Sequence, residues 1–263
     1  MMSLERDILT KIKTADGTTQ AKLNAAYANG GAELAISTVQ KMMNIHIDRY
    51  VLINMKGLVQ LVDAVGGITV NNTLGFPISI EENEPEYKAV VESGEQHING
   101  DQALVYSRMR YQDPEGDYGR QKRQREVIQK VVQKVLSLNS VSHYQAILKA
   151  VSNNMQTNVE LSSSSIPQLL GYQDAFKNIE SKQLKGEGAT LPDGGSYQIV
   201  TSEHMLEMQN VLRKSLGLDE VTELETNAVL YEELYGSAAD SSAYSSNPYG
   251  TDQNGQYYGQ YGQ

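Results

Sequence analysis

Apolar positions along the chain follow two spacings, one typical of strands and one typical of helices. Short apolar runs over Tyr50–Asn54 and Ile68–Val70 predict buried strands. Between them, Lys56 to Val65 has helical spacing and ends at the pair Gly66–Gly67. This strand–helix–strand order predicts an α/β fold built in layers.

Helical spacing recurs on both sides of this unit. It predicts helices over residues 21–43, 143–150, 166–178 and 204–216, with a turn at residues 29–31. Residues 179–186 and 196–200 have the pattern of strands around a turn at residues 192–195. The stretch from Gly75 to Gly94 is polar and acidic, so we expect it to be a surface excursion.

The segment DQALVYSRMRY, residues 101–111, is interpreted as alternating like a strand. An alternation with a period of two predicts a strand with Leu104, Tyr106, Arg108 and Arg110 on one face. The sequence therefore places two arginines side by side at the end of a predicted strand.

A turn at Gly116–Asp117 and a helix continuing to residue 138 are predicted next. At 100° per residue, one face of this helix carries two arginines, a glutamine and four aliphatic residues: Arg120, Arg123, Gln124, Val127, Val131, Val135 and Leu138. Another face carries Lys122, Arg125 and Gln129. An arginine on the apolar stripe is costly unless it is paired.

Five of the eight arginines lie between Arg108 and Arg125. Guanidinium groups form two-pronged hydrogen bonds with phosphate and carboxylate, so the cluster predicts an anion site. The alternative is a set of structural ion pairs with Asp113, Glu115 and Asp117, which accounts for Lys122 and Arg125 better than for the other four arginines. Of the acids, Asp117 is the one best placed to orient them.

Composition limits the classes of function. No lysine or arginine follows Lys214, and eight acidic residues do, so the rest of the chain carries about −2 of the net charge of −10. A nearly neutral body argues against general nucleic-acid binding. The absence of cysteine excludes disulfides, thiol catalysis and zinc–thiolate sites. The four histidines lack the spacing of zinc ligands.

Three ordered blocks resemble the LytR–CpsA–Psr family. They are SLERDILTKI with KLNAAYANGG, then HIDRYVLINMKGLVQLVDAVGGITVNN, then GEQHINGDQALVYSRMRYQDPEGDYGRQKRQREVIQKVVQKV. The resemblance covers roughly residues 3–216 and implies a mixed central β-sheet with helices on both faces. The resemblance assigns residues 1–216 to one domain. Charge and composition separate an acidic segment over 217–235 and a tail over 236–263, which we expect to be disordered because its composition offers no core.

The resemblance implies a chemistry as well. Family members are envelope phosphotransferases that move a glycopolymer, such as wall teichoic acid or capsule, from a polyprenyl-pyrophosphate carrier to peptidoglycan, usually with magnesium. The motifs carry pyrophosphate binding over to six residues: Arg6, Arg108, Arg110, Arg120, Arg123 and Gln124. They carry the catalytic positions over to Arg108 and to Asp117, the acid of the Gly-Asp element.

The N-terminal end of the sequence differs from the family pattern. Members normally begin with a transmembrane helix and a strand–loop–strand region whose acids hold the metal, whereas this sequence begins at the Arg-Asp block. We therefore expect a fragment, or a native start upstream, with the N-terminal strands and the metal ligands missing. The resemblance implies action at the extracytoplasmic face of the membrane.

Two other functions remain as alternatives. One is a binder of anionic lipid or polymer that transfers nothing, and the other is a transcriptional attenuator, a label often given to this family. The sequence contains no helix-turn-helix pattern and no basic helix suited to DNA. Metal-dependent turnover separates the enzyme from the binder, and a salt-sensitive gel shift separates both from the regulator.

Overall fold

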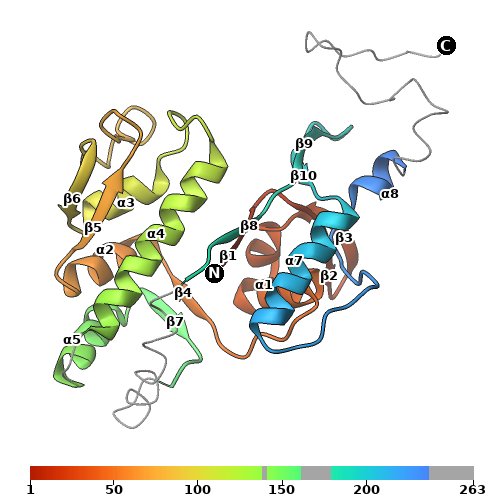
Figure 1. Ribbon diagram of the computed structural model, residues 1–263, viewed down its shortest axis with the longest axis horizontal. Coiled ribbons are helices and arrows are strands. Elements are labelled where there is room, and N and C mark those ends of the chain that lie inside the picture. The colour runs from red at the N-terminus through yellow and green to blue at the C-terminus, as the bar shows by residue number, and fades with distance from the viewer. Residues whose placement is uncertain (138–140, 161–178, 237–263) are drawn as a thin grey trace. The chain divides into compact units, whose positions relative to one another are not determined.

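The computed structural model describes residues 1–137, 141–160 and 179–236 of the chain. These residues form an α/β fold, as predicted (Figure 1). Their strands pair into five two-stranded sheets. They divide into two compact units. The first unit contains Met1–Ser3 and Asp48–Lys182, and the second contains Leu4–Ile47 and the residues from Gln183 onward.

The first unit follows the predicted strand–helix–strand order from residue 50 to residue 70. Its elements are β4 (Val51–Ile53), α2 (Met55–Ala64), β5 (Ile68–Asn72), β6 (Gly94–Ile98), α3 (Gly100–Arg108), α4 (Asp117–Leu136), α5 (Val141–Val151) and β7 (Met155–Thr157). Strand β5 pairs with β6 and β4 pairs with β7, both antiparallel. The predicted helix at 143–150 is thus confirmed as α5.

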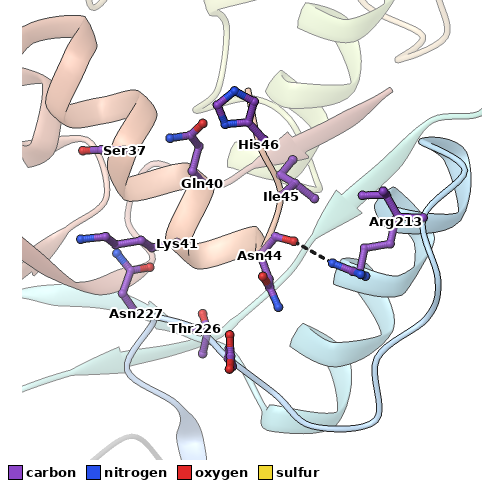
Figure 2. Close-up of a pocket in the computed structure, with 11 residues that line it drawn as sticks. Ser37, Gln40, Lys41, Asn44, Ile45, His46, Arg213, Thr226 and Asn227 are labelled. Atoms are coloured by element: carbon purple, nitrogen blue, oxygen red, sulfur yellow. Dashed lines mark hydrogen bonds between the residues drawn. The ribbon is translucent and has the colours of Figure 1, made fainter. Parts of the chain in front are cut away.

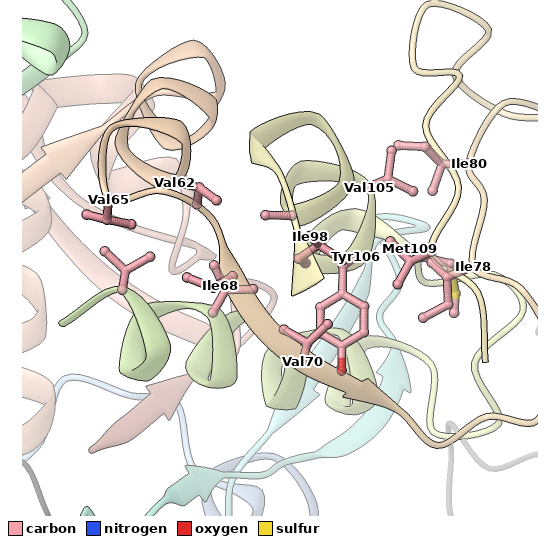
Figure 3. Close-up of a cluster of buried hydrophobic side chains, with 14 of the residues drawn as sticks. Val62, Val65, Ile68, Val70, Ile78, Ile80, Ile98, Val105, Tyr106 and Met109 are labelled. Atoms are coloured by element: carbon pink, nitrogen blue, oxygen red, sulfur yellow. The ribbon is translucent and has the colours of Figure 1, made fainter. Parts of the chain in front are cut away.

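The apolar core of the first unit lies between α2, β5, α3 and α4 (Figure 3). Ile78, Ile80 and Val91 belong to this core, although the stretch from Gly75 to Gly94 was expected to lie wholly on the surface. Ile78 and Val91 bond to each other through both backbone N–H groups, at 2.8 and 3.0 Å. The many acidic residues of this stretch gave it a polar pattern, so the sequence did not predict that these three apolar residues would be buried.

The strand predicted at residues 101–111 is wrong, because Gly100–Arg108 forms helix α3. Asn99 and Gln102 form a capping box at its start. Asp63 Oδ1 also accepts a hydrogen bond from Gly100 N at 2.7 Å, which satisfies a further N–H group at this helix end. All four residues from Ala103 to Tyr106 are buried. This stretch therefore lacks the polar positions at helical spacing that would have predicted a helix.

Helix α4 begins at Asp117 after Gly116, as predicted, with Gly116 at φ 55°. Lys122 is exposed and bonds to Glu115, and Arg123, Val127 and Val131 are buried. The assignment of Arg125 to an outward face is wrong, because Arg125 is buried and donates to the Ser3 hydroxyl. Burial lowers the pKa of this guanidinium. Position 138 of the predicted stripe lies outside the described residues.

A buried ion pair joins the end of α3 to the first turns of α4. The Arg123 guanidinium pairs with Asp113, and the two side chains are 8% and 3% exposed. Arg123 Nε also donates to Tyr106 O at 2.8 Å, and Nη2 donates to Met109 O. Three polar groups at the C-terminal end of α3 and in the following loop are thus satisfied by a single side chain.

The second unit contains two hairpins and three helices among its described residues. Its elements are β2 (Leu9–Thr14), β3 (Gly17–Lys22), α1 (Ala25–Met43), β9 (Glu187–Thr190), β10 (Ser196–Ile199), α7 (Ser202–Ser215) and α8 (Tyr231–Tyr235). The short strands β1 (Met2–Leu4) and β8 (Lys182–Leu184) pair with each other. The predicted turn at 192–195 and the helix at 204–216 are confirmed by β9–β10 and α7.

Some predictions for this unit differ from the structure or fall outside it. The hairpin β2–β3 was not predicted, and residues 29–31 form a kink inside α1 at Gly30 and Gly31 instead of a turn before it. The described part of the acidic segment 217–235 lies in this unit. The predicted helix at 166–178 and the predicted disordered tail lie outside the described residues. Across residues 1–137, 141–160 and 179–236, every helix is too short or too polar to cross a membrane.

We expect Asn99→Ala to lower the free energy of unfolding by about 0.5–2 kcal/mol, because α3 loses its N-terminal cap. The matched control is Asn153→Ala, since Asn153 is exposed and follows the end of α5. Urea denaturation measures both. A loss at Asn99 no larger than the loss at Asn153 would contradict the capping role.

We expect Gly119→Ala to be destabilising although alanine favours helix by about 1 kcal/mol. A Cβ at Gly119 overlaps the Asp113 carboxylate, which Arg123 and the Glu115 N–H hold in place. Disrupting a buried ion pair costs about 3–5 kcal/mol, so the net loss is about 2–4 kcal/mol. In the control Gly188→Ala, the nearest atom lies 3.8 Å from the new Cβ, and no such loss should appear in thermal denaturation.

Candidate functional site

Arg108 is the last residue of α3 and lies among three side chains of the same unit. Its guanidinium pairs with Glu84, contacts Met55 Sδ and lies over the Tyr87 ring, 5.4 Å from the centroid. The Arg108 side chain is 26% exposed. Its Nε is buried and has no hydrogen-bond partner among the described residues. The Arg108 guanidinium is thus held in place by its neighbours and is partly accessible, and its Nε–H group forms no hydrogen bond with a described residue.

Arg110 follows two residues later and is held differently. Its guanidinium lies 4.8 Å from the centroid of the exposed Tyr111 ring. No carboxylate of the described residues pairs with it. Arg108, Arg110 and Glu84 line one small hollow. The structure therefore brings together the two arginines that the sequence placed on one strand, although the segment is a helix end and a loop.

The first two turns of α4 carry the other predicted site residues. Asp117 Oδ1 lies 2.5 Å from Arg120 Nη2, and Asp117 Oδ2 accepts a hydrogen bond from Gln121 at 2.8 Å. Gln124 Nε2 donates to Ser107 O at 3.2 Å, next to Arg108 in the chain. Arg120 and Gln124 are one helical turn apart, so they project from the same face of α4. This face is the one that meets the end of α3.

Arg123 has a different place from the other arginines. Its Nε, Nη1 and Nη2 all donate within the protein, and its side chain is 8% exposed. The alternative of structural ion pairs holds for Arg123 with Asp113, for Lys122 with Glu115 and for Arg120 with Asp117. The expectation that Asp117 was the one acid suited to orient the cluster is wrong, since Glu84 and Asp113 also pair with arginines.

Arg6 belongs to the second unit. Its Nε lies 3.4 Å from Asp7 Oδ1, and the side chain is 48% exposed. Lys22 Nζ also approaches Asp7 Oδ1, at 3.2 Å. The Arg-Asp pair follows strand β1 closely in the chain.

Several residues around the site were not predicted. Glu84 and Tyr87 come from the acidic excursion, and Met55 from the start of α2. Tyr106 donates its hydroxyl to Glu126 at 2.7 Å, and burial together with this bond raises the pKa of the Tyr106 phenol. The acidity of residues 81–86 was the only sequence signal for Glu84, and it did not indicate which acid would reach Arg108.

The described residues do not fit a complete magnesium site. Magnesium requires several oxygen ligands in octahedral geometry. Among residues 1–137, 141–160 and 179–236, no group of three or more histidine, aspartate or glutamate side chains gathers to hold a metal. Both carboxylate oxygens of Asp117 already have protein partners.

The chain is similar to proteins with names of two kinds. It is 64% identical over 258 residues to "Biofilm regulatory protein A" of Streptococcus mutans, covering 96% of this chain and 63% of that protein. It is 49% identical to the polyisoprenyl-teichoic acid–peptidoglycan teichoic acid transferase TagU of Enterococcus faecalis, covering 82% of this chain and 68% of that protein. The chain thus spans less than two thirds of the length of the first relative.

A solved structure has the same fold. The crystal structure of protein gbs0355 from Streptococcus agalactiae superposes with a TM-score of 0.84 at 62% identity, covering 89% of this chain and 80% of that one. The LytR_cpsA_psr family matches residues 1–214. This match includes α3, α4 and every predicted site residue, and the chain belongs to the LytR_cpsA_psr family.

Proposed function

We propose that this protein transfers a glycopolymer from a polyprenyl-pyrophosphate carrier to peptidoglycan during assembly of the cell envelope. The observation that carries the proposal is the pair Arg108 and Arg110, which line one hollow while Arg110 has no carboxylate partner among the described residues. The name of the Enterococcus faecalis relative supports the substrate class. The extracytoplasmic face of the membrane is the proposed place of action.

The proposed reaction is a displacement at phosphorus. An acceptor hydroxyl of peptidoglycan forms a new P–O bond to the phosphorus that carries the glycopolymer. The P–O bond to the other phosphate breaks, polyprenyl phosphate leaves, and the hydroxyl proton passes to solvent. Such transfers are catalysed mainly by positioning and by stabilising charge on the phosphate oxygens. Fixed guanidinium groups supply this stabilisation.

We assign different roles to the site residues. Arg108 and Arg110 bind the pyrophosphate directly, since both line one hollow. Arg120 contributes charge from α4, and Asp117 positions it. Gln124 and Arg123 hold the end of α3, where Arg108 is located. Pyrophosphate binding by Arg6 is a proposal that rests on the family resemblance. For Arg123, which the resemblance also names, the internal hydrogen bonds favour the positioning role instead.

Magnesium belongs to the proposal as an expectation of the same resemblance. We assign no ligand to it within the described residues, and no step above uses it. The proposed role of the arginines is testable without metal, because binding of a pyrophosphate in the absence of turnover depends on the guanidinium groups.

The alternative proposal is regulation, which the name of the Streptococcus mutans relative supports. Direct control of transcription requires a basic surface that meets the DNA backbone. In the basic stretch of α4, Arg120 and Arg123 pair with Asp117 and Asp113, and Lys122 pairs with Glu115. A salt-sensitive gel shift with DNA at micromolar protein would favour the regulator.

We expect Arg108→Ala and Arg110→Ala each to weaken binding of geranyl pyrophosphate by about 10- to 100-fold. A hydrogen bond to a charged group contributes about 1.5–3 kcal/mol, and about 1.4 kcal/mol corresponds to tenfold. Lysine at either position should restore only part of the affinity, since a point charge cannot reproduce the two-pronged geometry. Titration calorimetry measures the affinities.

Lys122→Ala is the control for these variants. Lys122 lies on α4 and is exposed, whereas Arg125 is buried and cannot serve. Lys122→Ala should leave the affinity within about twofold, because rim charges contribute little. Equal and small effects at Arg108, Arg110 and Lys122 would reject the pyrophosphate site.

We expect Glu84→Gln to tighten binding of the same ligand by about two- to fivefold. Glu84 pairs with Arg108, so a pyrophosphate must displace it, and partly exposed pairs contribute up to about 1 kcal/mol. Glu82→Gln removes the same charge from an exposed position of the same stretch. An equal gain for both variants would indicate a general charge effect in place of competition at Arg108.

A further inference from the structure

A hollow of about 680 Å³ lies in the second unit, and none of the predicted site residues lines it (Figure 2). The last turns of α1, Arg213 of α7 and the segment from Leu218 to Asn227 form its walls. All lining side chains except Ile45 and Leu218 carry hydrogen-bonding groups. The volume is within the range of small-molecule sites.

Buried hydrogen bonds hold the walls in place. Gln209 is fully buried, and its Nε2 donates to Met42 O and Glu225 O, each at 2.8 Å. Thr226 Oγ1 donates to the same Met42 carbonyl at 3.0 Å. Asn210 exchanges two hydrogen bonds with the Val221 backbone. The hollow is therefore preformed, which lowers the entropic cost of binding.

The hollow has an excess of positive charge although the surrounding segment is acidic. Arg213 donates to Asp219 O at 2.7 Å and to Asn44 O at 3.2 Å, and both acceptors are neutral carbonyls. Lys41 is exposed and forms no ion pair with a described residue. Glu225 is the one carboxylate among the lining residues described. Two cations and one anion thus favour an anionic ligand.

Neutral donors and acceptors also remain available. Gln40 Oε1 accepts a hydrogen bond from Ile47 N at 2.8 Å, and its amide N–H groups bond to no described residue. Asn227 Nδ2 donates to Lys11 O at 3.1 Å. Asn227 Oδ1 is buried and has no hydrogen-bond partner among the described residues. A buried acceptor without a partner is costly.

We propose that this hollow binds an anionic sugar or polyol, with its phosphate or carboxylate at Lys41 and Arg213 and its hydroxyls at Gln40 and Asn227. Under the proposed transfer function, on which this choice of ligand rests, such groups come from either of two sources. One is the phosphate-bearing polymer being transferred, and the other is the carboxylate-bearing peptidoglycan acceptor.

The test is titration of the whole chain, followed by ¹H–¹⁵N NMR, with two anionic probes and a neutral one. The probes are a glycerol phosphate oligomer, the disaccharide of N-acetylglucosamine and N-acetylmuramic acid, and chitobiose. Saturable shifts at Lys41, Asn44 and Asn227 are expected with at least one anionic probe. The probe that binds identifies the source.

Matched variants distinguish binding in the hollow from a general effect of the protein's charge. Lys41→Gln should weaken binding about tenfold, as expected for one charge-assisted bond of about 1.5–3 kcal/mol. Glu225→Gln should strengthen it. Lys214→Gln removes the same charge from an exposed residue beside Arg213 that does not line the hollow, and should change nothing. Arg213→Gln is the weaker test, because Arg213 also holds two carbonyls.

Three results would overturn the inference: no saturable shift with either anionic probe, chitobiose binding as tightly as they do, or an equal loss with Lys214→Gln. The outcome is independent of the pyrophosphate site. Arg108→Ala should leave sugar binding unchanged. If the sugar binds while geranyl pyrophosphate does not, the hollow stands and the proposed transfer function fails.

Discussion

The buried ion pair between Arg123 and Asp113 fixes the relation between α3 and α4 in the first unit. An unpaired guanidinium at this depth would cost several kcal/mol, and here each of its three nitrogens has an acceptor. Because two acceptors are carbonyls of Tyr106 and Met109, the pair sets the position of the residues on either side of Arg108. The accessible residues Arg108 and Arg110 thus lie at the end of α3 and directly after it, where the backbone is held in place.

This arrangement divides the basic stretch into buried and accessible charges. Arg123 stabilises the fold, Arg120 is held by Asp117, and Arg108 and Arg110 line a hollow. Glu84 pairs with Arg108, so the site contains its own competing anion. Two arginines with an exchangeable carboxylate suit a ligand of high negative charge, such as a pyrophosphate, better than a weakly charged one.

Local signals in the sequence predicted part of this arrangement. Gly116 and Asp117 marked the start of α4, and helical spacing placed Arg123 among the aliphatic residues of its buried face. Helix α3 was mistaken for a strand because its central residues are buried on all sides and only its capping box indicated a helix. The burial of other residues depends on contacts between distant parts of the chain, which the local sequence pattern does not indicate. Arg125 is buried against Ser3, more than a hundred residues away in the chain.

The most direct test of the pyrophosphate site is a crystal structure of this chain with geranyl pyrophosphate. The account predicts phosphate oxygens at about 2.7–2.9 Å from the guanidinium nitrogens of Arg108 and Arg110. It also predicts that the Glu84 carboxylate has left Arg108, while Arg123 still pairs with Asp113. A pyrophosphate bound elsewhere, with Glu84 still on Arg108, would contradict it.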